Sequence, residues 1–391
     1  MRKRNLTITV LLAVATALGG TSIAPVLAAT KTTKKKTTTT KKATVTTKKA
    51  ATTKATAAAT STAVTTAASQ PTATGTDTTP AIVAATNAFL ATLSADQKQA
   101  VQFEFSNTAQ RQKWSNLPEG LYSRSGVMWG KLSDASKAAW LNVMKATLSE
   151  EGYARVIAEW DGDETLAANG GGGGLQFGKQ YYWIAIIGAP SATTKWQWQW
   201  GGHHVTVNAT IVGTEVALSP SFIGVQPATY KDASGKEVRP LGDIEAEAFA
   251  LVNSLDASEK TKAIIGTNVI DLVVGPGADG KTVAKEGLKG SDMTAGQKAA
   301  MLHLVGHYGG LVNAEDGAAR MADLQANLDQ TYFAWSGPTT KGSGMYFRVA
   351  GPTVVAEYSG QSMGGNSAEH IHGIYRDPTN DYGAKLGAGL K

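Results

Sequence analysis

The sequence has no cysteine among its 391 residues. This absence excludes a disulfide framework, a cysteine nucleophile and a metal site made of thiolates. A long hydrophobic run is also missing near the N-terminus, because the apolar segment there, residues 6–18, is thirteen residues long and too short for a comfortable transmembrane span. Histidine is scarce, with six residues in the chain. The positions of these few histidines therefore carry much of the chemical information.

Basic residues are concentrated at the N-terminus and are outnumbered by acids elsewhere. The chain has 37 Lys and Arg against 31 Asp and Glu. Twelve of the basic residues and one acid, Asp77, fall within residues 1–80, which leaves 25 basic and 30 acidic residues from Ala81 onward. A net charge of −5 on this body does not support a nucleic-acid-binding fold, which would need a basic surface.

Residues 1–28 have the layout of a secretory signal peptide. A positive start, Arg2-Lys3-Arg4, is followed by the apolar segment, and Val26-Leu27-Ala28 then precedes a cleavage site at Ala29. We therefore expect export to the periplasm, the cell envelope or the medium. An uncleaved N-terminal anchor is the alternative.

Residues 29–80 consist almost entirely of Thr, Ala and Lys. Such a segment cannot offset its ordering entropy by burying apolar surface, so we expect a disordered linker. Two roles stay open: a basic tether to an acidic envelope polymer or membrane surface, and a solvated spacer. The threonines are also compatible with O-glycosylation. The folded domain is then expected to be residues 81–391.

Seven helices are predicted in this domain, and four of them share one kind of start. Ser94 with Gln97, and Thr294 with Gln297, fit a capping box, which satisfies free N–H groups of the first turn. Because the intervals between the starts are irregular, we interpret their recurrence as capping chemistry and not as a solenoid repeat. The predicted helices span residues 82–92, 95–105, 134–158, 243–254, 257–265, 295–308 and 315–328.

Aromatic and β-branched segments predict strands at the centre and the end of the domain. Residues 181–187 are rich in both types, and residues 196–200 alternate Trp with Gln, which places three indoles on one face. Two further strands are predicted at residues 346–349 and 353–358. The fold class is therefore α+β, with central and C-terminal antiparallel strands packed against several capped helices in a single large domain.

Two short motifs match enzyme patterns without the context that each pattern needs. Gly275–Thr282 matches the P-loop letter for letter, but Gly287 and Gly290 follow where a helix is required. We interpret this segment as a turn. Gly360–Gly364 matches the nucleophile elbow of serine hydrolases, although loop-forming residues follow it. A serine hydrolase using Ser362 is kept as an alternative.

The histidines form three close pairs, each with its own geometry. His370 and His372 project to the same face of an extended segment, so two imidazoles can meet one metal ion. An extended His203-His204 would send its rings to opposite faces, although the preceding Gly201-Gly202 allows a bulge that redirects either ring. The third pair shares one helix face but lacks the glutamate of the zinc-protease pattern HExxH. That pair is His303 and His307.

Several stretches of the domain carry a family resemblance: residues 187–191, 200–204, 222–227, 346–348 and 370–383. They resemble the bacterial domain-of-unknown-function 3500 family over residues 85–386. The stretches GGHH and HIH…RDPTNDYG are the most specific parts. The resemblance implies an exported fold without an established activity. The family pattern covers His203, His204, His370, His372, Arg376, Asp377 and Asp381, and it does not include the helical pair.

The first functional hypothesis is an exported metalloenzyme. His370, His372 and one of His203 and His204 bind a divalent ion and leave one position open for water. Imidazole ligands favour zinc, copper or iron over magnesium or calcium. Hydrolysis is the default reaction, because zinc-bound water is a nucleophile near neutral pH. Copper would indicate oxidation.

Charged residues near the histidines have roles in this hypothesis. Asp377 or Glu357 acts as a base or orients an imidazole, and Arg376 with Arg348 clamps an anionic group such as phosphate or carboxylate. The expected partner is therefore an anionic small molecule or an envelope polymer. The oligomeric state is left open.

The second hypothesis is a non-catalytic module that binds the cell envelope or carbohydrate. Trp196, Trp198 and Trp200 would then form an aromatic platform for sugar rings. The other interpretation of these residues is a buried sheet face, which we favour because large aromatic side chains dominate protein cores. Exposed tryptophans with scattered histidines would favour the module.

Overall fold

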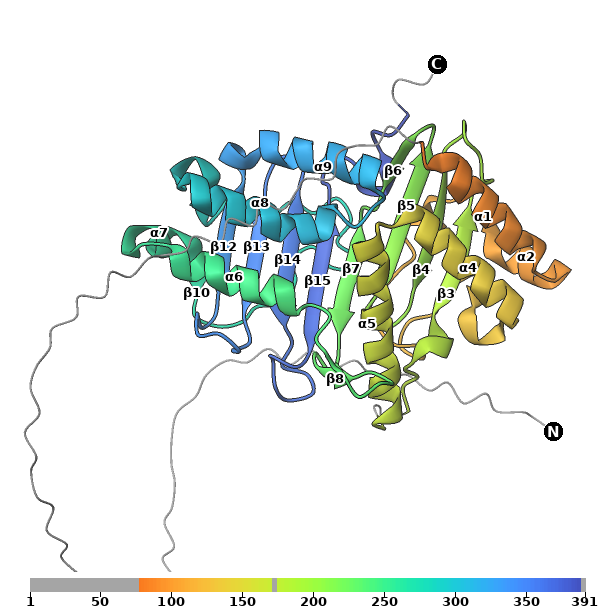
Figure 1. The fold of residues 1–391 in the computed structure, drawn as a ribbon, viewed down its shortest axis with the longest axis horizontal. Helices are drawn as coiled ribbons and strands as arrows, with labels where there is room; N and C mark the ends of the chain where they lie inside the picture. Colours follow the sequence, from red (N-terminus) through yellow and green to blue (C-terminus); the bar gives the residue numbers. More distant parts are fainter. Residues whose placement is uncertain (1–76, 171–173, 388–391) are drawn as a thin grey trace, which may run out of the picture. The chain divides into compact units, whose positions relative to one another are not determined.

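The computed structural model of the protein describes residues 77–170 and 174–387 (Figure 1). The signal peptide expected at residues 1–28 and most of the expected linker lie outside these described residues. The first helix begins at Thr79, within the last two residues of the expected linker. The described residues fold as one α+β domain, which confirms the predicted fold class.

A mixed sheet of 13 strands runs through the domain. Its main path is β1-β3-β4-β5-β7-β15-β14-β13-β12-β10, and neighbours are antiparallel except at the two ends, where β1 pairs with β3 and β10 pairs with β12 in parallel. The short strands β2, β6 and β11 add to β3, β5 and β12, while β8 and β9 form a separate pair. The strands span β1 Gln102–Phe103, β2 Val127–Met128, β3 Trp183–Ile187, β4 Trp196–Gly201, β5 Thr206–Val212, β6 Glu215–Ala217, β7 Ser221–Val225, β8 Tyr230–Lys231, β9 Glu237–Val238, β10 Ile264–Gly266, β11 Leu288–Lys289, β12 Tyr332–Ser336, β13 Tyr346–Ala350, β14 Val355–Gly360 and β15 Ile371–Arg376.

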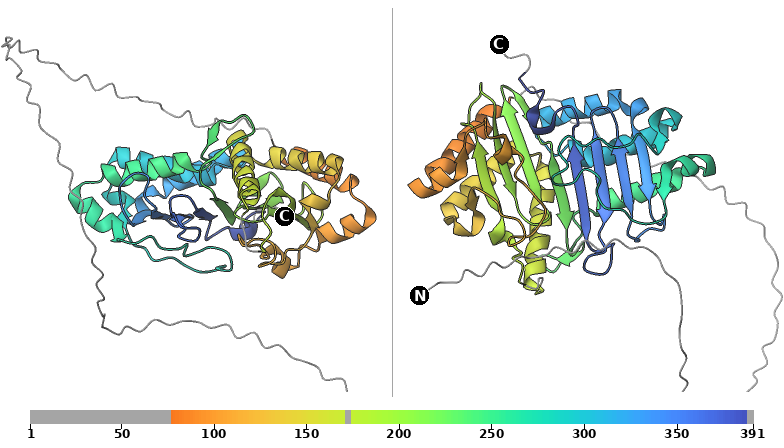
Figure 2. Two further views of the ribbon diagram at one scale, coloured as in Figure 1. Left: turned by 90° about the horizontal axis from the view of Figure 1, so that it is seen from below. Right: turned by 180° about the vertical axis from the view of Figure 1, so that it is seen from behind.

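Helices cover one face of the sheet, and loops cover the other (Figure 2). α1, α4 and α5 lie over the part of the sheet that contains β3 to β5, and α6, α8 and α9 lie over the part that contains β12 to β15 (Figure 1). The α-helices span α1 Thr79–Ala91, α2 Ala95–Val101, α3 Thr108–Arg111, α4 Asp134–Thr147, α5 Glu150–Ala168, α6 Gly242–Ser254, α7 Ala257–Ala263, α8 Ala295–Gly309 and α9 Ala314–Ala326.

The predicted helix caps are present. Ser94 Oγ accepts a hydrogen bond from the Gln97 backbone N–H at 3.2 Å, and the Gln97 side chain accepts one from the Ser94 N–H at 3.1 Å. Thr294 and Gln297 form the same reciprocal pair at the start of α8. Each pair satisfies two N–H groups that the helix itself leaves free, so local side-chain chemistry fixes where these helices begin.

The predicted helix 134–158 is wrong in its middle, because two helices occupy this segment. α4 ends at Thr147 and α5 begins at Glu150. Leu148 between them is extended, with ψ of 154°, and Ser149 caps α5 by accepting a backbone N–H at 2.9 Å. A serine cap thus interrupts a segment whose apolar pattern is continuous.

The domain consists of two halves with the same order of elements. The first half runs α1, α2, β1, β2, α4, α5, β3, β4, β5, with the short α3 inserted between β1 and β2. The second half runs α6, α7, β10, β11, α8, α9, β12, β13, β14. In each half, one short strand pairs in parallel and another in antiparallel with the same partner, β3 or β12. β7 and β15 pair antiparallel at the centre, which relates the halves by an approximate two-fold axis. The recurring helix starts therefore occupy equivalent places, and capping alone was an incomplete interpretation.

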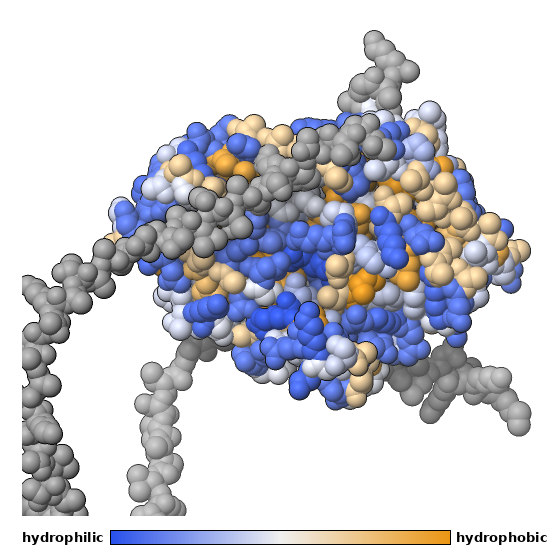
Figure 3. Space-filling view, viewed as in Figure 1, coloured by the Kyte–Doolittle hydropathy of each residue, from blue (hydrophilic) through white to orange (hydrophobic). Residues whose placement is uncertain are grey.

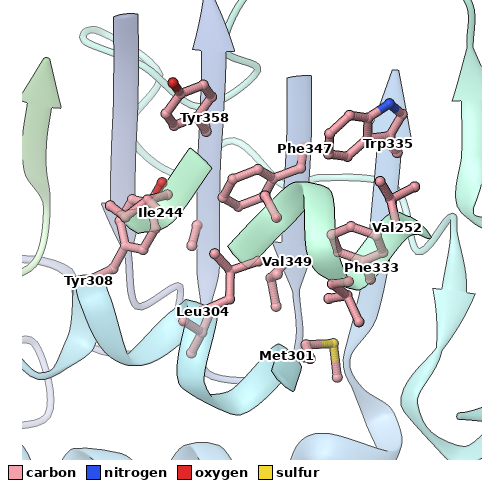
Figure 4. Packing of buried hydrophobic residues seen from close by; sticks show 14 of the residues in the cluster. Ile244, Val252, Met301, Leu304, Tyr308, Phe333, Trp335, Phe347, Val349 and Tyr358 are labelled. Carbon is pink, nitrogen blue, oxygen red and sulfur yellow. The ribbon is translucent and has the colours of Figure 1, made fainter. Parts of the chain in front are cut away.

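Each half has a hydrophobic core between the sheet and its helices. Figure 4 shows the core of the second half, where side chains of α6 and α8 face aromatic and aliphatic side chains of β12, β13 and β14. Burial of each large apolar side chain contributes about 1.5–3 kcal/mol. The labelled residues of this core are Ile244, Val252, Met301, Leu304, Tyr308, Phe333, Trp335, Phe347, Val349 and Tyr358.

The tryptophans of β4 belong to the core of the first half. Trp196, Trp198 and Trp200 have no exposed surface. The Trp200 ring packs edge-on against Trp160 of α5, with 5.0 Å between ring centroids, and Trp198 packs in the same way against Trp140 of α4 at 5.5 Å. The interpretation as a buried sheet face is confirmed. These indoles offer no exposed platform for sugar rings.

The outer surface of the helical layer is largely hydrophilic. Figure 3 shows hydrophilic side chains over much of the visible helix-covered face, interrupted by small apolar areas. Within the described residues, every helix is too short or too polar to cross a membrane. The apolar surface of these helices therefore serves the two cores.

Candidate metal centre

The loop-covered face of the sheet carries polar side chains, in contrast to the apolar face beneath the helices. Residues that lie directly opposite each other in antiparallel strands point to the same face. His372 of β15 lies opposite Ser359 of β14 and Gly224 of β7, so these three positions share the loop-covered face. The candidate site lies where this face reaches the turn between β4 and β5.

Four histidines from two distant segments meet at this turn. His203 and His204 form the turn, while His370 and His372 lie at the beginning of β15. β7 stands between the two segments, and it presents Gly224 beside His372. A Cβ at Gly224 would lie 3.1 Å from the carbonyl oxygen of His204. Glycine at this position therefore lets the turn approach β15 closely.

Three of the imidazoles converge through the same type of nitrogen. His204 Nε2 lies 2.8 Å from His370 Nε2, and His370 Nε2 lies 3.1 Å from His372 Nε2. For comparison, a tetrahedral zinc ion with Zn–N bonds of ~2.05 Å holds its nitrogen ligands about 3.3 Å apart. The spacing of the three nitrogens is close to that of a three-histidine metal site.

The turn has an unusual backbone that brings the His204 ring into the cluster. His204 adopts a left-handed conformation with φ of 67°, which costs a non-glycine residue about 1–2 kcal/mol. The Gly202 N–H donates to the Val205 carbonyl at 3.0 Å, and the His204 N–H donates to the Asn116 carbonyl at 3.4 Å. The rings of His203 and His204 lie side by side, with centroids 3.6 Å apart. The preceding glycines left such a redirection open; it comes from a turn between β4 and β5 and not from a bulge in a continuous strand.

Hydrogen bonding fixes the tautomer of His370. Its Nδ1 lies 2.7 Å from the carbonyl oxygen of Met363, which can only accept, so Nδ1 carries a hydrogen and Nε2 offers a lone pair. Burial lowers the pKa of His204, His370 and His372, and the neighbouring imidazoles lower it further. The three rings are therefore neutral near pH 7, the form that binds metals.

Hydrogen bonds among the three rings cannot satisfy this cluster. The lone pair of His370 Nε2 accepts one N–H, yet the Nε2 atoms of both His204 and His372 lie within 3.1 Å of it. His204 Nδ1 is also buried without a hydrogen-bond partner among the described residues, a cost that a metal ion at Nε2 leaves in place. A cation at the centre can use all three Nε2 atoms at once, so the residues present fit a metal ion.

The fourth histidine is held by an acid from α5. His203 Nδ1 lies 2.6 Å from Asp163 Oδ1, and the Tyr182 hydroxyl donates to the His203 carbonyl. Asp163 is 1% exposed. Such a carboxylate–histidine contact fixes the orientation and the tautomer of an imidazole.

A second acid of α5 lies one helical turn before Asp163. Glu159 Oε2 accepts the Gly224 N–H at 3.3 Å, and Glu159 Oε1 is buried without a partner among the described residues. Complete burial raises the pKa of Glu159 to about 8, while Arg155 opposes this shift. Sequence reasoning missed both acids. The available signal was their i, i+4 spacing beside Trp160 on an otherwise apolar helix face.

The cluster is largely enclosed. His204 has no exposed surface, His370 is 5% exposed and His203 is 8% exposed, whereas His372 is half-buried. The half-buried Asn116 contributes an amide nitrogen 3.5 Å from His372 Nε2. His372 and Asn116 are therefore the more exposed residues at the edge of the cluster.

Comparison with known families places this domain. A family model described as "Protein of unknown function (DUF3500)" matches residues 75–384. The chain belongs to this family. Comparisons with curated proteins and with solved structures give no match. Two stretches of this DUF3500 domain carry the most specific resemblance, residues 201–204 and 370–383. The first contains His203 and His204 of the cluster, and the second contains His370, His372 and the rest of β15.

Arg376 and Asp377 do not reach the histidines, contrary to our expectation. Arg376 lies four residues beyond His372 on β15, a distance of about 13 Å at 3.3 Å per residue. It donates to Asp381 at 2.7 Å and to backbone carbonyls of the covering loop. Asp377 accepts from Arg320 at 3.1 Å. An extended strand adds about 3.3 Å per residue, so residues close to His372 in sequence lie far from it in space. The contacts of Arg376 and Asp377 therefore stabilise the C-terminal end of β15.

Glu357 and Arg348 also belong to a separate network, which corrects their expected roles. The Glu357 carboxylate accepts the Val274 N–H at 2.8 Å and the Tyr346 hydroxyl at 2.5 Å. Arg348 donates to the Tyr346 hydroxyl at 3.2 Å and to Glu286 at 2.5 Å. Their polar atoms are thus engaged in holding the covering loop to the sheet. Neither residue is free to act as a base or as an anion clamp at the histidines.

The two motif matches are loops in the structure. Gly275–Thr282 contains two turns and is not followed by a helix. No helix follows Ser362 either, and the exposed Ser362 accepts the Gly365 N–H through its carbonyl at 3.0 Å. The structure of Gly275–Thr282 agrees with the interpretation as a turn. The segment around Ser362 lacks the strand–turn–helix geometry of a nucleophile elbow. The remaining pair, His303 and His307, lies on α8 in the helical layer.

Proposed function

We propose that the Nε2 atoms of His204, His370 and His372 bind one divalent transition-metal ion, and that the protein is a metal-dependent enzyme with hydrolysis as its default reaction. The convergence of three neutral imidazole nitrogens, at separations of 2.8 and 3.1 Å, carries this proposal. Zinc, copper and iron are the candidate ions, because neutral imidazoles suit them.

The number of ligands favours a catalytic site over a structural one. Structural zinc sites close the coordination sphere with four protein ligands, whereas catalytic sites use three and keep a position open. The open side in this proposal faces Asn116, whose amide nitrogen lies 3.5 Å from His372 Nε2. The Asn116 amide would donate a hydrogen bond to a substrate oxygen bound there.

The proton chemistry is assigned to His203 and Asp163. A bound metal ion supplies a water molecule of lowered pKa and polarises the scissile bond. His203 lies against the His204 ring, and Asp163 holds it through Nδ1 at 2.6 Å. His203 would accept a proton during the reaction while Asp163 stabilises the resulting imidazolium. The near-complete burial of His204 and His370 would exclude bulk water from the reacting atoms.

The location and substrate class follow from the sequence and belong to the same proposal. The signal-like segment at residues 1–28 supports an exported protein, and the Lys-rich residues 29–80 support contact with an acidic envelope surface. An envelope polymer is the proposed substrate, because the arginines expected to bind an anionic small molecule, Arg348 and Arg376, lie in other networks.

Metal analysis of the protein, purified without a polyhistidine tag, tests this proposal. We expect His204→Ala and the double variant His370→Ala/His372→Ala each to contain one metal ion fewer per chain than the wild type. Thr353→Ala is the matched control and should lose none. Thr353 lies two residues after Gly351 in the turn between β13 and β14, as His204 lies two residues after Gly202 in the turn between β4 and β5. Hydrolysis of a chromogenic phosphoester or carboxylic ester should require the same histidines. Equal metal content in all four proteins would contradict the proposal.

A further inference from the structure

A second group of histidines and carboxylates lies where α5, α6 and α8 meet, in the helical layer. His303 Nδ1 and His307 Nε2 lie 2.8 and 3.0 Å from the same oxygen, Glu247 Oε2. The two histidines stand one helical turn apart on α8, and Glu247 belongs to α6. Three ligand atoms from two helices thus gather in a space that one ion can fill. Figure 3 shows hydrophilic side chains over this junction.

One buried nitrogen of this group lacks a hydrogen bond. The His307 side chain is 10% exposed, and its Nε2 contacts Glu247 Oε2 at 3.0 Å but makes no hydrogen bond among the described residues. An unpaired buried nitrogen is costly. A metal ion bound at Nε2 removes this cost. Nδ1 then carries a hydrogen that faces Glu151 and Asp243, whose oxygens lie 3.4 and 3.6 Å away, and the Arg155 guanidinium nitrogen, now 3.1 Å from Nδ1, would shift onto these carboxylates.

The charges around His307 favour a divalent cation. Glu151, Asp243 and Glu247 all have an oxygen within 3.6 Å of its ring nitrogens. Arg155 pairs with Glu151 at 3.0 Å and with Asp243 at 2.8 Å. With both imidazoles deprotonated, as metal binding requires, the three carboxylates and one guanidinium carry a charge of −2. One divalent ion balances it.

We propose that His303, His307 and Glu247 bind one divalent transition-metal ion of the zinc type, separate from the ion proposed at the sheet. Two imidazoles and a carboxylate suit this class of metal. The ion connects α6 to α8, and its remaining coordination positions face an open cavity of about 650 Å³ that His303, His307 and Glu151 help to line. It therefore stabilises the helical layer of the second half where that layer meets α5.

Titration with Co²⁺ tests the site in the full chain, without a polyhistidine tag. His204→Ala/His370→Ala/His372→Ala serves as the background, because the replacement of His370 and His372 alone would leave Asp163, His203 and His204 as a group that could hold an ion. We expect one Co²⁺ to bind, with a visible absorption band and a rise in Tm. Adding Glu247→Gln or His303→Ala to this background should weaken Co²⁺ binding by about tenfold or more. Since His303 is half-exposed, its replacement should leave the circular dichroism spectrum unchanged.

Glu150→Gln is the matched control. Glu150 lines the same cavity from the first turn of α5 and loses the same charge, but it is outside the three-ligand group. Its replacement should leave Co²⁺ affinity within about threefold, as expected for an exposed charge. Absence of Co²⁺ binding in the background variant, or equal weakening by Glu150→Gln and Glu247→Gln, would overturn the proposal. The group would then be an ion-pair network in which Arg155 donates to His307 Nδ1, 3.1 Å away. Because the background variant lacks the histidines proposed to bind a metal at the sheet, failure of Co²⁺ binding at α8 would leave the proposed function untouched.

Discussion

The two halves of the domain form the same turn between equivalent strands, but only one of these turns carries histidines. The Gly202 N–H donates to the Val205 carbonyl at 3.0 Å in the first half, and the Gly351 N–H donates to the Val354 carbonyl at 2.8 Å in the second. The backbone of the turn is therefore stabilised in the same way twice. The residues between these ends are His203-His204 in one half and Pro352-Thr353 in the other.

Each turn also contacts an acid on a long helix of its own half. Asp163 of α5 lies 2.6 Å from the His203 ring, and Asp323 of α9 accepts the Thr353 hydroxyl at 2.6 Å. The same arrangement of turn and helix thus carries a candidate metal centre in one half and a simple polar contact in the other. This difference shows that the fold supplies a position, while a few side chains supply the chemistry.

Two glycines test whether the halves are equivalent in their packing. Gly126 and Gly287 have φ of 110° and 105°, and a Cβ at either would overlap a backbone carbonyl oxygen, that of Ile184 or of Phe333. These carbonyls belong to β3 and β12 and cannot move without disturbing the sheet. We expect Gly126→Ala and Gly287→Ala each to lower the free energy of unfolding by about 4 kcal/mol or more, measured by denaturant titration.

Gly277→Ala is the control for this pair. Gly277 has φ of 77°, but nothing lies within 4 Å of the position that a Cβ would take. Only the left-handed backbone penalty of about 1–2 kcal/mol should remain. A large loss at Gly126 together with a small loss at Gly287 would break the equivalence of the halves.

Burial of Glu159 should give the first half a dependence on pH. Its pKa in the folded protein is raised to about 8 by burial, whereas glutamate in an unfolded chain titrates near about 4.3. Between these values the folded state keeps a proton that the unfolded state has lost. The free energy of unfolding therefore falls as pH rises through this window, because the folded state binds more protons.

Glu159→Gln should remove this dependence, since glutamine resembles the protonated carboxyl in shape and charge. At pH 9 the variant should be more stable than the wild type by on the order of 3 kcal/mol, and at pH 4 the two should differ little. Denaturant unfolding at pH 4, 7 and 9 measures the difference. An unchanged pH slope in the variant would mean that Glu159 titrates normally in the folded protein.

Asp163 of α5 and Asp323 of α9 provide a matched pair of variants, for which a smaller effect, on metal affinity, is expected. Asp163→Asn should weaken metal binding at the sheet by about 10–100-fold, because His203 loses its orienting carboxylate and the adjacent His204 ring loses support. Asp323→Asn removes the corresponding acid of the second half and should leave metal affinity unchanged. Competition with a chromogenic chelator measures both. Equal affinities in the two variants would show that Asp163 has no influence on the metal.

Local chemistry made much of the fold and part of the site predictable. The capping box of Ser94 marks a helix start within four residues, and the i, i+2 spacing of His370 and His372 sets two rings on one face whatever surrounds the strand. Gly201 and Gly202, which precede His203, also indicated an irregular backbone. These features depend on neighbours in sequence, so a single sequence displays them.

The rest of the site depends on contacts between distant segments. Asp163 meets His203 across 40 residues and two intervening strands, and no local pattern couples the two. Arg376 shows the reverse error, because it is near His372 in sequence but about 13 Å away along an extended strand. The duplication of the halves was visible only in the recurring helix starts, since the equivalent turns have different residues. Such features follow from the sheet order and not from spacing.

The smallest effect is expected at Lys281, in the segment that imitates a P-loop. This segment belongs to the loop that covers the polar face of the second half, and it is held there by its carbonyls: Arg376 donates to Val274 at 2.8 Å and to Gly275 at 3.2 Å. A phosphate cradle would need free N–H groups and the N-terminus of a helix instead. The Lys281 side chain is exposed, and its N–H closes a turn at 3.1 Å with the Ala278 carbonyl.

Lys281→Ala should therefore change the free energy of unfolding by no more than about 0.5 kcal/mol and leave metal content unchanged. The turn survives the substitution, because alanine keeps the backbone N–H that closes it. Calorimetric titration with ATP should show no binding to either protein. ATP binding to the wild type that disappears in the variant would contradict the turn interpretation. The second half would then have a ligand site of its own, as the histidine cluster is proposed to be in the first half.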